Sequence, residues 1–168
     1  MLKNIAIILF VFVSSYVLAS GNISTRQVHH QSRDAQAPNF TLPMARGGMK
    51  TFSDVRAGKK TILFFWATWC PHCHDGLQQV NDQIDNLKKK DINLVMVDLG
   101  ETREDVVSFM NASQMDLDSF IDTDGILQDL YEIRGVPTFY FIDEKGFIRN
   151  MTHALPENYD EYFLSKLN

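Results

Sequence analysis

The chain has only two cysteines, and both lie in the run Trp69-Cys70-Pro71-His72-Cys73. An unbroken apolar stretch, residues 61–66, comes directly before this run, and apolar residues at helical spacing follow it. A Cys-x-x-Cys pair that leaves a buried strand and opens a helix can form and break its own disulfide. The feature therefore predicts a strand-to-helix junction that carries a redox centre.

Other uses of these cysteines stay open on the residues alone. A structural zinc site needs four ligands and ordinarily a second, distant pair, whereas here His72 and His74 are interleaved with the cysteines at the start of one helix. A purely structural disulfide is another alternative, and so is a redox-inert chaperone or a carrier in copper or haem maturation. Catalytic thiol–disulfide exchange is the leading interpretation. It requires the Cys70–Cys73 disulfide and no further cofactor or metal.

The amino-terminal residues are typical of export. Lys3 precedes an apolar run from residue 5 to residue 19, and small residues stand where a signal peptidase would cleave. We expect a signal peptide at residues 1–19, or an uncleaved anchor as the alternative, followed by a flexible linker at 20–36 and one domain at 37–168. With either a cleaved signal peptide or an uncleaved anchor, we expect the domain in the periplasm or cell envelope, where disulfides persist.

Composition limits the partners. The 168 residues carry a net charge of −5, which argues against nucleic acid. We expect protein thiols and disulfides as clients, a recycling partner protein, and contact with a membrane only through the possible anchor. Four Asn-x-Ser/Thr triplets leave a eukaryotic secretory pathway open as an alternative location, and they begin at Asn22, Asn39, Asn111 and Asn150.

Periodicity and turn residues predict the order of the elements. Strands are expected at residues 39–42, 49–52, 61–66, 92–97 and 117–121, and at 138–142 and 147–151 on either side of a hairpin turn. Helices are expected after Cys73, after a capping box at residues 102–105, at 126–131 and from Pro156 onward. Strands that alternate with helices and end in a hairpin predict an α/β sandwich around a mixed sheet.

At this point the motifs carry a resemblance. Residues 65–73, together with Gly135-Val136-Pro137-Thr138, resemble the thioredoxin superfamily over residues 37–168. Ala37-Pro38-Asn39-Phe40 and Gly58-Lys59-Lys60 resemble its exported TlpA/ResA branch. The resemblance implies a thioredoxin-like sandwich and a thiol–disulfide oxidoreductase activity. It also implies an extra strand and helix between the Cys-x-x-Cys helix and a cis-proline.

The two cysteines receive different roles. Cys70 would begin the helix, where free N–H groups and the helix dipole stabilise a thiolate, so we expect it to be the nucleophile. Cys73, one turn further on, would resolve the mixed disulfide. Pro71 suits the first helical turn, and His72 adds a donor or partial positive charge near the sulfur. The Cys-Pro-His-Cys motif resembles that of the oxidising DsbA group, while the direction of electron flow stays open.

The resemblance also implies a substrate surface. Pro137 matches the family's cis-proline, Val136 would pair with a substrate peptide as an added strand, and Trp69 would flank the site. Two positions depart from the pattern: Phe64 stands where thioredoxins carry a buried acid, and Gly76 where ResA-like reductases carry a glutamate. We therefore expect proton transfer at Cys73 to lack its usual helper.

Overall fold

The computed structural model describes residues 35–164, so the expected leader at 1–19 and most of the expected linker lie outside the described residues. The elements in chain order are β1 (Thr41–Pro43), β2 (Met49–Thr51), α1 (Phe52–Arg56), β3 (Lys60–Trp66), α2 (Pro71–Lys89), β4 (Ile92–Leu99), α3 (Arg103–Ala112), β5 (Phe120–Asp122), α4 (Ile126–Leu130), β6 (Thr138–Ile142), β7 (Ile148–Thr152) and the short 3-10 helix η1 (Tyr159–Phe163).

A five-stranded mixed sheet forms the centre, in the order β5-β4-β3-β6-β7. β3 runs parallel to β4 and antiparallel to β6, while β4 and β5 are parallel and β6 and β7 antiparallel. β3 occupies the middle because its residues from 61 to 66 are all buried, so both of its faces need cover. β1 and β2 form a separate two-stranded hairpin.

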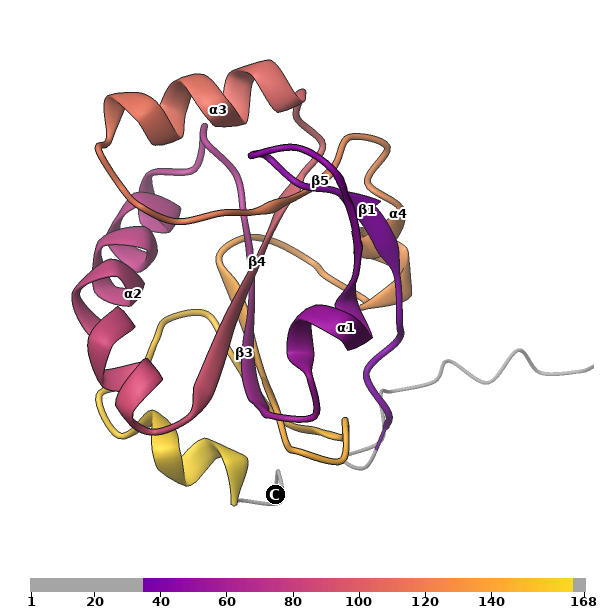
Figure 1. The fold of residues 1–168 in the computed structure, drawn as a ribbon, viewed down its shortest axis with the longest axis vertical. Coiled ribbons are helices and arrows are strands. Elements are labelled where there is room, and N and C mark those ends of the chain that lie inside the picture. The colour runs from indigo at the N-terminus through magenta and orange to yellow at the C-terminus, as the bar shows by residue number, and fades with distance from the viewer. Residues whose placement is uncertain (1–34, 165–168) are drawn as a thin grey trace, which may run out of the picture.

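Helices cover both faces of this sheet, as Figure 1 shows with α2 on one side of β3 and β4 and α1 on the other. Successive side chains of a strand point to opposite faces. Phe64 and Met96 accordingly belong to the cluster under α2, α3 and η1, whereas Phe65 and Val97 belong to the cluster under α1 and α4. The protein is thus a three-layer α/β sandwich.

Helix α2 has the local signals that its sequence predicts. Cys70 is the N-cap residue and Pro71 takes the first helical position, where a missing N–H costs nothing. Leu77, Val80 and Leu87 are buried at helical spacing against the sheet. The helix ends among lysines, whose charges complement the dipole.

Between the Cys-x-x-Cys helix α2 and the cis-proline lie two strands and two helices, β4, α3, β5 and α4. The fold class predicted from the sequence is confirmed by this topology. The fold begins slightly before residue 37, since Gln36 pairs with Phe147 in an isolated bridge and Ala35 accepts a hydrogen bond from Ile148. Along the described residues, no helix is long and apolar enough to cross a membrane.

Most strand ends differ from the prediction by one to three residues, as in β1 and β5, and two differences change the type of element. The predicted strand at 49–52 ends one residue early, because Phe52 begins α1 and stacks on Phe40 with ring centroids 4.9 Å apart. The helix predicted from Pro156 begins instead at Tyr159 and is a 3-10 helix. Tyr159 and Phe163 are buried on the sheet, so packing sets the start of this turn.

Candidate active site

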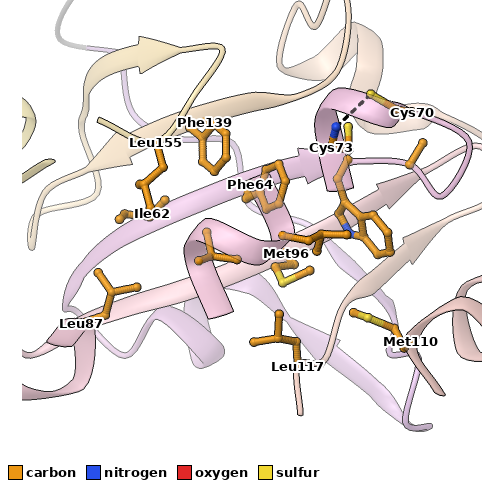
Figure 2. Close-up of a cluster of buried hydrophobic side chains, with 14 of the residues drawn as sticks. Ile62, Phe64, Cys70, Cys73, Leu87, Met96, Met110, Leu117, Phe139 and Leu155 are labelled. Carbon is orange, nitrogen blue, oxygen red and sulfur yellow. Dashed lines mark hydrogen bonds between the residues drawn. The ribbon is translucent and has the colours of Figure 1, made fainter. Parts of the chain in front are cut away.

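Cys70 lies at the junction of β3 and α2 and faces the loop before β6. As the N-cap residue, its sulfur accepts a hydrogen bond from the Cys73 N–H at 3.3 Å, drawn as the dashed line in Figure 2. Its thiol donates to the Val136 carbonyl oxygen at 3.5 Å. The Val136–Pro137 peptide bond is cis. The structure therefore brings together Cys70, Cys73, Val136 and Pro137, all of which the sequence had singled out.

Both cysteines are free thiols, and both are buried. Cys70 is 4% exposed and Cys73 is fully buried. Burial raises the pKa of Cys73 far above its usual value, and the hydrogen bond with Cys70 raises this pKa further. The two sulfurs therefore differ in their surroundings. The Cys70 sulfur lies under the loop that carries Val136, and the Cys73 sulfur lies in the protein interior.

The surface beside Cys70 is apolar and open. Trp69 is 68% exposed, and Pro71 and His72 are exposed as well. Val136 is half-buried across from them. Trp66, at the end of β3, is by contrast fully buried and donates from Nε1 to the Ser119 hydroxyl at 3.0 Å.

The loop that carries Trp69 is held by two residues that sequence reasoning missed. Glu101 accepts hydrogen bonds from the backbone N–H and the hydroxyl of Thr68, each at 2.5 Å. His74 contacts the Thr68 carbonyl oxygen through Nε2 at 2.7 Å, and its ring packs on Phe109. No local pattern could reveal these contacts, because Glu101 and Phe109 lie beyond the next strand.

The two departures at Phe64 and Gly76 belong to one packing arrangement. Phe64 stacks on Phe139 with ring centroids 4.2 Å apart, and Figure 2 shows the two rings side by side beyond Cys73. A Cβ atom at Gly76 would lie 3.1 Å from the Phe64 ring and 3.2 Å from the Phe139 ring. The aromatic pair therefore fills the space under α2, and a larger residue at position 76 would press on its rings.

A buried acid is nevertheless present in this part of the core. Asp98, near the end of β4, is fully buried. Burial, and secondarily the neighbouring Glu101, raises its pKa to about 8. The charge of Asp98 in turn contributes to the raised pKa of Cys73. The usual acid positions at Phe64 and Gly76 carry no acid, as expected, but a buried acid stands on β4 instead.

Metal ligands do not gather around the site. Across residues 35–164, no three side chains of His, Cys, Asp or Glu are placed to hold one metal ion.

The mixed sheet, the cysteine at a helix N-cap and the cis-proline facing it define a thioredoxin-fold protein. Residues 34–151 match the AhpC/TSA family, and the chain belongs to this family of thioredoxin-like proteins. It is 31% identical over 128 residues to the thiol-disulfide oxidoreductase ResA of Bacillus subtilis, a match that covers 76% of this chain and 71% of ResA.

Solved structures agree. The crystal structure of StoA from Bacillus subtilis has a TM-score of 0.60 and 28% identity, and the match covers 70% of this chain and 88% of StoA. The exposed lipoprotein thioredoxin Etrx1 of Streptococcus pneumoniae has a TM-score of 0.62 and 25% identity, and the match covers 71% of this chain and 92% of Etrx1. The chain is accordingly a thiol–disulfide oxidoreductase of the ResA-like branch.

Proposed function

We propose that Cys70 and Cys73 are the redox centre through which this protein exchanges disulfides with protein partners outside the cytoplasm. One observation carries the proposal: the Cys70 sulfur stands at the amino terminus of α2, faces the loop before β6 at 3.5 Å, and has Cys73 buried directly behind it. A helix N-terminus favours the thiolate, which is the attacking form of cysteine.

The reaction proceeds in two exchanges. The Cys70 thiolate attacks a sulfur of the partner's disulfide, and the other partner sulfur leaves as a thiolate. Cys73 then attacks Cys70, the Cys70–Cys73 disulfide forms, and the second partner sulfur leaves. The partner gains two electrons and the cysteine pair loses two; the reverse sequence oxidises a partner instead.

The partner peptide has a place beside the sulfur. The Val136 backbone offers an edge for an added strand, and Trp69 offers an exposed apolar surface on the other side of Cys70. His72, exposed next to Cys70, tunes the stability of its thiolate. A partner that lies across these residues brings its disulfide within reach of Cys70.

The apolar run at residues 5–19 supports export, with residues 1–19 as signal peptide or anchor and the folded domain in the periplasm or cell envelope. The similarity to an exposed lipoprotein thioredoxin supports the same location. Disulfide exchange suits such a compartment, since disulfides persist there.

Trapping tests the proposal. The Cys73→Ser variant should accumulate mixed disulfides with partner proteins, which reducing agent releases, and Cys70→Ser should accumulate none. A redox titration of the parent protein, with metal analysis of the same sample, separates exchange from a carrier role. A parent couple that does not titrate would overturn the proposal. So would copper or haem bound to the parent in stoichiometric amounts, together with a Cys73→Ser variant that traps no partner.

A further inference from the structure

Asp98 is the one described buried side chain whose polar atoms lack a hydrogen-bond donor. It is fully buried, and neither of its carboxyl oxygens makes a hydrogen bond of good geometry with the described residues. The backbone N–H of Glu101 lies near enough only to lower the Asp98 pKa in part. A buried polar group without a partner costs free energy, so its place in the fold calls for a reason.

Strand alternation puts Asp98 on the face of the sheet that α2 covers. Met96, two residues earlier in β4, belongs to the same cluster as Cys73, whereas Val97 and Leu99 belong to the cluster on the opposite face. In register, Asp98 lies opposite Trp66 of β3. The carboxyl group therefore shares an apolar space with the Cys73 sulfur, and its charge acts on the pKa of that thiol.

The polar neighbour of Asp98 is another acid. Both carboxyl oxygens of Glu101 accept hydrogen bonds from Thr68. The carboxyl groups of Asp98 and Glu101 can form a hydrogen bond with each other only when one of them is protonated. Asp122 of β5 adds a weaker repulsion. Burial first, and then these two acids, raise the pKa of Asp98 and hold a proton on it close to neutral pH. General acid–base catalysis is most effective for such a group.

Glu101 also gives this proton a route to solvent. It is half-buried, while Asp98 is fully buried, so the pair leads from the interior near Cys73 to the edge of the site. The route passes the loop that carries the active-site Trp69, because Glu101 holds that loop through Thr68.

We propose that Asp98 is the proton-transfer residue of Cys73, in place of the acid that thioredoxins carry at the position of Phe64. The inference rests on the proposed exchange through Cys70 and Cys73. Phe64 pairs with Met96 and Trp66 pairs with Asp98, so the acid has moved to the neighbouring strand and two residues towards the cysteines.

In the mixed disulfide, the Cys73 thiol gives its proton to the Asp98 carboxylate, and the thiolate attacks the Cys70 sulfur. The Cys73–Cys70 bond forms, the bond from Cys70 to the partner breaks, and the partner sulfur leaves with the electron pair. In the reverse direction, Cys73 leaves as a thiolate and takes the proton from Asp98. Glu101 and water then restore the protonation of Asp98.

Stopped-flow reaction of the reduced full-length chain with dithiobis-nitrobenzoate separates the two steps. Attack by Cys70 releases one coloured thiolate, and resolution by Cys73 releases a second. In the parent, the second rate should rise with pH and level off near pH 8, where Asp98 is ionised. In Asp98→Asn, the second rate should fall about 100-fold near neutral pH and rise without levelling off, while the first stays unchanged.

Two further variants make the test specific. Asp75→Asn removes an exposed acid two residues after Cys73 and should leave both rates at parent values. Glu101→Gln removes the repelling charge and should move the levelling of the second rate to lower pH, which a merely structural role would not do.

If the second thiolate release in Asp98→Asn kept the parent's rate and pH profile, the role of Asp98 would be overturned. If Asp98→Asn did not fold, an unchanged pH profile of the second release in Glu101→Gln would overturn it. A parent protein that releases only one thiolate would overturn the proposed exchange itself, independently of Asp98.

Discussion

The buried carboxyl of Asp98 makes the stability of this fold depend on pH. In the folded chain its pKa is raised from 3.8 to about 8, so the group keeps its proton across a range in which the unfolded chain has lost it. Between these two values, ionisation stabilises only the unfolded chain. The free energy of unfolding should therefore fall as pH rises from about 4 to about 8, and this loss should level off above the folded pKa.

The substitution Asp98→Asn removes this titration and keeps the shape of the side chain. A pKa difference of about 4 corresponds to about 6 kcal/mol at about 1.4 kcal/mol for each pKa unit. Relative to the parent, the variant should gain up to this amount between about pH 4 and about pH 8. The new amide can donate to Glu101, so the variant places no unpaired charge in the core.

Urea unfolding at about pH 4 and about pH 8, followed by tryptophan fluorescence, measures the difference between variant and parent. Asp75→Asn serves as the matched control, because Asp75 is exposed on α2 and should follow the parent at both pH values. A difference between Asp98→Asn and the parent that stays constant with pH would refute the reasoning. It would mean that Asp98 ionises in the folded chain as it does in water.

Other predictions concern the packing under α2 and the residue beside the nucleophile. Gly76→Ala should lower the free energy of unfolding by about 1–3 kcal/mol, because its Cβ would press on the rings of Phe64 and Phe139; unchanged denaturation midpoints would contradict this. Phe64→Asp should cost at least about 3 kcal/mol and should not speed the second thiolate release; a faster release in a folded variant would show that the acid is needed on β3. His72→Ala should make the couple more reducing, by roughly 30 mV for each 1.4 kcal/mol of stabilisation that the Cys70 thiolate loses, as measured against glutathione buffers. A potential that does not move would remove His72 from the redox centre.

Much of the fold could be predicted because its signals are local. The buried run before Cys70 indicates a central strand, and the spacing of Leu77, Val80 and Leu87 indicates the helix that follows. Element ends were less predictable: Phe52 begins a helix and Tyr159 a 3-10 turn because tertiary contacts bury these rings. Alternation and helical spacing act over a few residues, whereas the contacts that end an element come from elsewhere in the chain.

The same division holds at the candidate site. The sequence by itself determined the Cys70–Cys73 pair at a helix start and, through resemblance, the cis-proline loop that faces it. Only the tertiary structure decided that Asp98 of β4 lies on the same side of the sheet as Cys73 of α2, near enough for its charge to act on that thiol. Sheet register and the covering helix bring them together, and neither is written in the residues next to Asp98. The sequence shows that position 64 carries no acid. That Asp98 lies near Cys73 in its place follows only from the position of the neighbouring strand β4.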